Sequence, residues 1–454
     1  MTWRRSLALL GVSVALVQLT AFYGSVRALE SGGASMEAMV AKMDQVEYLR
    51  LADTMLTDRR FALAPDASAE VFRTPGYPAF VAFSYILSGH WYWAPFFASA
   101  LLVGLLAAFV ALLAASLGLS RSMSLASGAL MGFSSGSFLL ITTATGSDVL
   151  YTLVYALAVL CAVRTEDGTR RSIAVGVLLG LATLVRPIGI LASLPLLFGH
   201  GLIRNDTWRG YARGCVIAFA AWALMLAPWY VRNAAVTGTP LLSTVSTFNV
   251  VYYNIPMNEA FWNNVPEETA RLDLMERIGS TSVDALRGAA YVDGMEHEAQ
   301  HYLSTHAIQY GIFHLYRTTP FFLASGFNVI NAVLAHEAPA LHIPLFPTES
   351  ENLTHAISEH RWHDVLFALS RYWFTSLERL GWLLAIGAAF AAPLLSSGRE
   401  RRVLLLFAVI IIANIILVSP VTQARYRFPA EPFIWAAAVY TGATLWNRYR
   451  HPRT

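Results

Sequence analysis

Charged residues are scarce in this 454-residue sequence: they make up 13% of it, against roughly 25% in an ordinary soluble domain. Hydrophobic residues make up 56%, and mean hydropathy is +0.49. This excludes a soluble globular enzyme and a disordered chain, because so much apolar surface needs lipid as its solvent. The only cysteines, Cys161 and Cys215, lie in apolar runs, which argues against a disulfide framework. A net charge of +3 is too small to indicate a nucleic-acid partner.

Long apolar runs, by contrast, are abundant. A transmembrane helix needs about 17–25 residues, and ten runs reach or approach that length. They cover residues 6–26, 93–117, 122–142, 149–163, 173–190, 191–203, 214–230, 377–395, 403–418 and 433–446. The segment 311–335 is ambiguous, and we expect it to lie in the membrane interface. The sequence predicts an all-α polytopic membrane protein, with about 10–12 transmembrane helices and interfacial helices in large external loops.

The arginines indicate how the chain is oriented. Nearly all basic residues are arginine, and they gather at the start of the chain, at every other connection and in the tail 447–454. The positive-inside rule makes these parts cytoplasmic, with both termini inside. The basic start of run 6–26 also fits a cleaved leader, but its length favours a retained span. The external face then receives the segments 27–92, 143–148, 232–376 and 419–432.

Two of these external segments are long, and long loops are uncommon unless they are functional. In the first, apolar residues recur at helical spacing over 39–53, which predicts a helix lying on the membrane surface. Asp44 and Tyr48 lie four residues apart, on one face of that helix. Arg73 precedes a rigid Pro-Gly-Tyr-Pro turn that contains Tyr77. A guanidinium there suits an anion near the interface.

The other external segments also carry charge. Asp148 begins the fourth span, and Arg425 and Arg427 lie in the last external loop, against the positive-inside bias. Arg186 lies near the external end of the fifth span, before Pro187, and an arginine within a span is a candidate site residue. These groups converge on one face of the membrane. They predict an active site of two carboxylates and several arginines at the lipid–water boundary.

Simpler interpretations of the same residues stay open. Asp44 fits one solvated acid among several, and Asp148 fits a helix cap. Arg73 fits an ion pair with Glu70 or Asp66, and the late arginines fit side chains that reach for lipid head groups. The histidines at 355, 360 and 363 match no strong metal-binding spacing.

Taken together, these motifs resemble the GT-C glycosyltransferases, which use polyprenol-phosphate sugars. The resemblance is greatest to the bacterial lipopolysaccharide galacturonosyltransferases and lipid A aminoarabinose transferases, with protein O-mannosyltransferases more distant, and it covers about residues 1–446. The matching motifs are Asp44…Tyr48, Arg73-Thr-Pro-Gly-Tyr-Pro, Ser147-Asp148…Tyr151, Gly180-Leu-Ala-Thr-Leu-Val-Arg186-Pro187, Pro228-Trp-Tyr-Val-Arg-Asn233 and Arg425-Tyr-Arg-Phe-Pro429. This sequence departs from the family pattern at one point, because many relatives have a lysine and a glutamate in the region of Arg73.

The resemblance implies an inverting transferase. It would move one sugar from a polyprenyl monophosphate to an external acceptor, a cell-envelope glycan, glycolipid or protein, in the bacterial inner membrane. Asp44 matches the general base, or the group that orients the acceptor. Asp148 matches the second acid, and the two acids permit a divalent cation such as Mg or Mn. The resemblance assigns donor phosphate to Arg73, Tyr77, Arg425 and Arg427, and substrate positioning to Tyr48 and Arg186.

Two other classes of function compete with this interpretation. An oligosaccharide polymerase or ligase has a similar multispanning body, but it uses diphosphate-linked donors. A flippase or transporter of lipid-linked sugar would line a path with charges at midplane depth, whereas the charges here gather at one interface.

Overall fold

The structure is a computed structural model that describes residues 2–41, 44–144, 146–204, 207–280, 282–334, 362–418, 420 and 423–450. Within these residues the chain is helical and contains no strand. Eight of the described helical stretches are long and apolar enough to cross a membrane. The predicted fold class, an all-α polytopic membrane protein, is confirmed.

The eight stretches correspond to eight of the ten predicted runs. They are α1 (Trp3–Ser31), α5 (Ala94–Ser116), α6 (Arg121–Gly132) with α7 (Ser135–Thr142), α8 (Ser147–Arg164), α9 (Gly168–Val185), α12 (Trp208–Thr237), the Trp373–Leu395 part of α22 (Trp362–Ala391) with η4 (Ala392–Leu395), and α23 (Gly398–Val418). The sixth run forms two short helices, α10 (Gly189–Ala192) and α11 (Leu194–Gly199). The tenth forms α24 (Glu431–Arg450), which is long enough but is not among the eight.

One predicted span is divided by its own sequence. The Ser134 hydroxyl accepts the backbone N–H of Ser137 at 3.1 Å, so this serine caps a new helix and separates α6 from α7. Ser120 likewise caps α6, and Asp167 caps α9. Short polar side chains therefore fix where these apolar helices begin.

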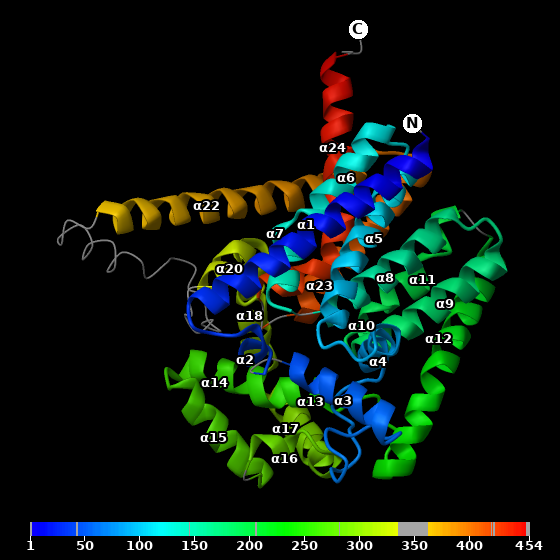
Figure 1. Ribbon diagram of the computed structural model, residues 1–454. Helices are drawn as coiled ribbons and strands as arrows, with labels where there is room; N and C mark the ends of the chain where they lie inside the picture. Colours follow the sequence, from blue (N-terminus) through cyan, green and yellow to red (C-terminus); the bar gives the residue numbers. More distant parts are fainter. Residues whose placement is uncertain are drawn as a thin grey trace.

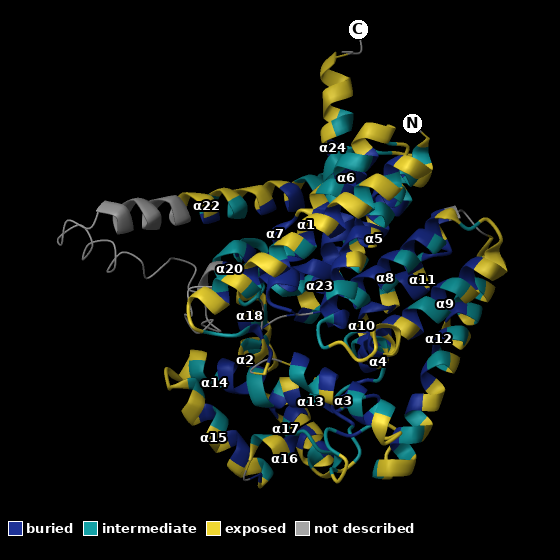
Figure 2. Ribbon diagram, viewed as in Figure 1, coloured by how far each residue is buried: buried dark blue, intermediate teal, exposed yellow. Residues whose placement is uncertain are grey.

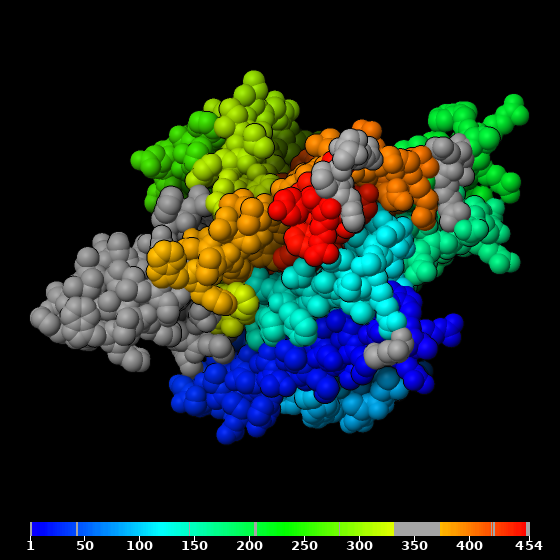
Figure 3. Space-filling model, turned by 90° about the horizontal axis from the view of Figure 1, so that it is seen from above, coloured from blue at the N-terminus to red at the C-terminus, as the bar shows by residue number. Residues whose placement is uncertain are grey.

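The helices pack into one bundle, with α9 along α12 and α5 along α1, α6 and α8. Large apolar side chains on α1 and α12 remain exposed, including Leu16 and Leu224, and Figure 2 shows yellow, exposed patches along both helices. Such surfaces suit lipid contact. The start of α1 and the end of α24 lie at one end of the bundle (Figure 1). From that end, α1 lies along one side, and the C-terminal helix emerges near the middle (Figure 3).

A second layer covers the opposite end of the bundle (Figure 1). It contains α13 (Val245–Phe248), the π-helix η2 (Asn249–Asn254), α14 (Ile255–Asn263), α15 (Glu267–Ile278), α16 (Val283–Leu286), η3 (Ala289–Tyr291), α17 (Val292–Thr305) and α18 (Ala307–Tyr316). We call residues 241–316 the α13–α18 domain. It has a hydrophobic core of its own, separate from that of the bundle.

The first connecting loop lies between the bundle and this domain. It forms α2 (Met36–Val40), α3 (Gln45–Thr57) and α4 (Gly76–Ser88). The single helix predicted over 39–53 is therefore wrong: it is interrupted between α2 and α3, and Asp44 stands at the start of α3. The described part of the ambiguous segment, 311–334, forms parts of α18, α19 (Thr319–Leu323) and α20 (Gly326–Leu334), and none of these is long enough to cross a membrane. The histidines at 355 and 360 lie outside the described residues.

Candidate active site

A small pocket lies at the end of the bundle remote from the start of α1 and the end of α24. Four segments that are far apart in sequence supply its walls: the first loop, the N-terminus of α8, the residue that ends α9, and the 3₁₀ helix η5 (Ala424–Ala430). The lining residues are Asp44, Gln45, Tyr48, Arg73, Ser147, Asp148, Arg186 and Arg425. The structure thus brings together six of the eight residues singled out from the sequence.

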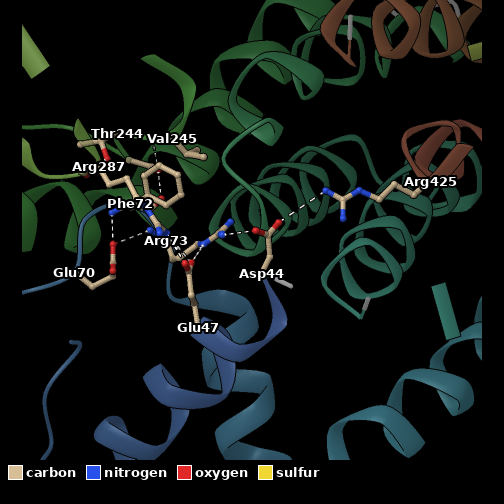
Figure 4. A network of polar contacts seen from close by, with 10 residues as sticks. Asp44, Glu47, Glu70, Phe72, Arg73, Thr244, Val245, Arg287 and Arg425 are labelled. Atoms are coloured by element: carbon tan, nitrogen blue, oxygen red, sulfur yellow. Dashed lines mark hydrogen bonds and ion pairs between the residues drawn. The ribbon is translucent and has the colours of Figure 1, made fainter. Parts of the chain in front are cut away.

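Asp44 lies between two arginines. Its Oδ1 is 2.8 Å from Nη2 of Arg73, and its Oδ2 is 3.8 Å from Nη2 of Arg425 (Figure 4). Burial opposes ionisation of this carboxyl, but the two guanidinium groups outweigh it and lower the pKa of Asp44 to about 2. The side chain is still 49% exposed and makes no capping hydrogen bond to α3. Asp44 is therefore an ionised acceptor that remains open to a substrate.

Arg73 is held by carboxylates that differ from those considered in the sequence. Its Nε lies 2.7 Å from Oε2 of Glu47, and its guanidinium packs against the rings of Tyr48 and Phe72. Glu70 instead accepts the backbone N–H groups of Phe72 and Arg73, which fixes the turn. The Arg73 side chain is therefore aimed at Asp44 and the pocket, and not at Glu70.

Asp148 and Arg186 form the second ion pair of the pocket. Asp148 lies in the first turn of α8 and makes no capping hydrogen bond, and its side chain is only 2% exposed. Its Oδ2 is buried and has no hydrogen-bond partner among the described residues. Arg186 ends α9 in an extended conformation, which Pro187 favours because its ring disfavours a helical residue before it.

Arg425 is the least satisfied cation of the pocket. Its Nη2 donates to the Tyr426 hydroxyl at 2.8 Å, while its buried Nε has no hydrogen-bond partner among the described residues. The nearest carboxylate oxygen recorded for it is Oδ2 of Asp44, at 3.8 Å. Arg425 therefore retains donor capacity for a further anion.

Arg427 lies outside the pocket. It is fully buried, and its Nη1 donates to the carbonyls of Phe321 and Ala324 at 2.9 and 3.2 Å. Its guanidinium lies 3.8 Å from the centre of the Trp382 ring and 3.7 Å from a carboxylate oxygen of Glu431. These contacts hold the side chain in the interior of the protein, although its Nε and Nη2 have no hydrogen-bond partner among the described residues.

Tyr77 also lies behind the pocket wall. Its hydroxyl accepts a hydrogen bond from Nε2 of Gln45 at 3.3 Å. A Cβ atom at Gly146 would lie 2.1 Å from this hydroxyl, so a glycine is required for Tyr77 to pack against the start of α8. A Cβ at Gly76 would likewise meet the backbone of Val185 at 2.7 Å. The rigid turn therefore joins α4 to α8 and α9, next to both acids.

The metal prediction for Asp44 and Asp148 remains untested. Among the described residues, no three His, Cys, Asp or Glu side chains gather as metal ligands. The available donor set is two carboxylates, each already paired with arginine.

Two residues that sequence reasoning did not select complete the site. Glu47 binds Arg73, and Arg287 of the α13–α18 domain lies 2.7 Å from a Glu47 oxygen. Glu47 follows Asp44 by three residues, which places the two on one face of a helix and was a usable signal. Arg287 gave none, because 240 residues separate it from its partner.

The fold and the site define a polytopic helical membrane protein with a charged pocket at one end. No protein-family profile and no curated relative matches the chain. A solved structure to which the chain is similar is the archaeal oligosaccharyltransferase AglB from Archaeoglobus fulgidus, in complex with an inhibitory peptide and a dolichol-phosphate. The TM-score is 0.47, with 14% identity over 89% of this chain. This chain spans about half of that protein, 46%.

Proposed function

We propose that the protein is an inverting glycosyltransferase, which moves a single sugar from a polyprenyl monophosphate to an acceptor outside the membrane. One observation supports this above all: a pocket at the end of an apolar bundle carries three arginines against two carboxylates. The cationic excess suits the phosphodiester that joins the sugar to the polyprenol, and the position suits a phosphate whose hydrocarbon chain lies in the bilayer.

The residues can divide the chemistry between them. The acceptor hydroxyl attacks the anomeric carbon, and Asp44 accepts the proton as the new C–O bond forms. The bond from that carbon to the phosphate oxygen breaks, and the phosphate leaves with the electron pair. Arg425 and Arg186 then stabilise the added negative charge, because preorganised cations act most strongly where charge develops.

The low pKa of Asp44 fits this role once a donor is present. An anion bound to Arg73 and Arg425 partly neutralises the two cations that hold that pKa down. The carboxylate then becomes a better proton acceptor when the phosphate is in place. Donor binding would in this way prepare the base.

The proposal places the pocket on the external face of a bacterial inner membrane, with both termini in the cytoplasm. Support comes from the arginine pattern and from the position of the termini at the opposite end from the pocket. The acceptor would be a cell-envelope glycan, a glycolipid or a protein, and a divalent cation shared by Asp44 and Asp148 remains part of the proposal.

Asp44→Asn tests the proposal directly. Purified protein in lipid nanodiscs would receive radiolabelled polyprenyl-phosphate sugar and a membrane fraction as acceptor. We expect the variant to transfer sugar at least about a hundred-fold more slowly than wild type, since removal of a general base typically costs that much. Transfer by Asp44→Asn at the wild-type rate would refute the catalytic assignment. Movement of the labelled lipid between leaflets, with no covalent product, would favour a flippase.

A further inference from the structure

Glu47 is a carboxylate shared by two arginines. One partner is Arg73 in the pocket, at 2.7 Å, and the other is Arg287 in the α13–α18 domain, also at 2.7 Å (Figure 4). The Glu47 side chain is only 16% exposed, so solvent screens these contacts less than it screens surface pairs. Through Glu47, the α13–α18 domain is thus linked to Arg73, the arginine that binds Asp44.

An aromatic side chain also packs across the junction between the first loop and the α13–α18 domain. Phe72, the residue before Arg73, is buried in the core of the α13–α18 domain, where its ring lies 5.2 Å from that of Phe248. The Arg287 guanidinium lies 4.1 Å from the centre of the Phe72 ring. The backbone is joined as well: the amide of Thr244 donates to the carbonyl of Val71 at 3.2 Å. The domain therefore holds both the backbone and the side chain next to Arg73.

This arrangement fixes the direction of the Arg73 guanidinium. Its Nε is engaged by Glu47 and its Nη2 by Asp44, so the planar group is bound at two atoms and cannot rotate freely. Without the negative charge of Glu47, the guanidinium is free to turn and bind both oxygens of Asp44. Such a bidentate pair would hold the carboxylate away from an acceptor hydroxyl.

We propose that Glu47 is a positioning residue, which couples the α13–α18 domain through Arg287 to the Asp44–Arg73 pair. The domain then sets the catalytic geometry of the pocket in addition to covering it. This inference rests on the proposed transferase function. It deepens that function by making Arg287, a residue outside the pocket, necessary for the transfer step.

The test compares Glu47→Gln, Arg287→Ala and the double variant in nanodiscs, with labelled polyprenyl-phosphate sugar and the membrane acceptor fraction. We expect each single variant to lower kcat about ten- to a hundred-fold, because small displacements of catalytic groups have effects of that size. The KM for the donor should change less than kcat, because Arg425 and Arg186 remain in place. The double variant should be no slower than Glu47→Gln, and Arg287→Lys should recover part of the rate.

The matched control is Arg277→Ala. Arg277 bridges Glu259 and Glu298 at 2.9 and 3.0 Å within the same domain, but it does not line the pocket. We expect this variant to transfer sugar at the wild-type rate. An equal loss in Arg277→Ala and Arg287→Ala would overturn the proposal, since it would show that any damage to the domain slows transfer. Additive losses in the double variant would overturn it too.

Hydrogen exchange separates this inference from the proposed function. The Thr244 amide reports the junction, because it donates to Val71 across it. We expect its exchange to accelerate about ten-fold or more in Arg287→Ala and to stay unchanged in Arg277→Ala. If exchange accelerates in Arg287→Ala but the wild type transfers no sugar, the transferase function is refuted. The link between Arg287 and the pocket would still stand. Unchanged exchange in Arg287→Ala would refute the link itself.

Discussion

Two arginines of the 3₁₀ helix η5, only two residues apart, lie in opposite surroundings. Arg425 faces the charged pocket, with its nearest carboxylate oxygen at 3.8 Å and its Nε unpaired among the described residues. Arg427 is enclosed in the protein, where it donates to two carbonyls and lies against Trp382. Arg425 can therefore meet a ligand in the pocket. Arg427 also has two buried nitrogens, Nε and Nη2, without a hydrogen-bond partner among the described residues, but it lies in the interior, where its contacts hold the chain together.

The difference shows that an arginine beside a membrane is not by itself a phosphate site. Arg427 joins three parts of the molecule: η5, the carbonyls at 321 and 324 beside α19, and α22 through Trp382. Its partner Glu431 also accepts a hydrogen bond from Ser134 at 2.6 Å, which adds α7 to the cluster. A buried ion pair of this kind tolerates removal of one partner poorly, because the other charge stays buried.

The largest effect should come from Arg427→Ala. The variant removes the contacts that join η5, α19 and α22 and leaves the buried Glu431 without its partner, so we expect a large fall in the unfolding temperature of the purified protein. The measurement is thermal unfolding in nanodiscs, followed by circular dichroism. The double variant Arg427→Met, Glu431→Gln removes both charges and should recover part of the loss. Wild-type thermal stability of Arg427→Ala would contradict the structural role assigned to this residue.

Arg425→Ala should show the reverse pattern. We expect kcat/KM for sugar transfer to fall about a hundred-fold, because a cation at the leaving phosphate is lost, while the unfolding temperature changes little. Arg425→Lys should recover only part of the rate, since an ammonium group cannot bind phosphate through two parallel hydrogen bonds. An unfolding temperature lowered as far as in Arg427→Ala would erase the distinction between the two residues.

Much of this site could be predicted from the arginine pattern. Counting basic residues placed Asp44, Arg73, Asp148 and Arg425 on one face, and the structure brings all four to one pocket. The division between Arg425 and Arg427 could not be predicted in this way. A 3₁₀ helix has about three residues per turn, so residues two apart point to different sides. Nothing in the local sequence announced that helix type.

The prediction of a single helix in the first loop was wrong for a related reason. Apolar spacing over 39–53 indicated one continuous helix, but α2 ends at Val40 and α3 begins at Gln45. The contacts that Asp44 makes at this break come from distant segments, through Arg73 and Arg425. Periodicity describes which face is apolar, and it carries no signal of ion pairs with residues far away in the sequence. Glu47 and Arg287 escaped prediction similarly, since their contact spans 240 residues.

The smallest expected effect concerns pH. The pKa of Asp44 is about 2, so in the free protein this carboxylate stays ionised throughout the range from about pH 5 to about pH 8. Loss of the Arg425 charge raises that pKa toward its ordinary value of 3.8, which is still below this range. We therefore expect kcat/KM to show no inflection due to Asp44, either in wild type or in Arg425→Ala.

The control for this measurement is a variant that changes Arg427 and leaves Arg425 in place. The double variant Arg427→Met, Glu431→Gln leaves both cations beside Asp44 in place, so it should share the wild-type profile. An acid limb near pH 6 that moves upward in Arg425→Ala and not in this double variant would show that Asp44 titrates far above the expected value. That result would mean that Arg73 and Arg425 do not keep Asp44 ionised before the donor binds. Asp44 would then act as a base of ordinary strength, without help from the bound phosphate.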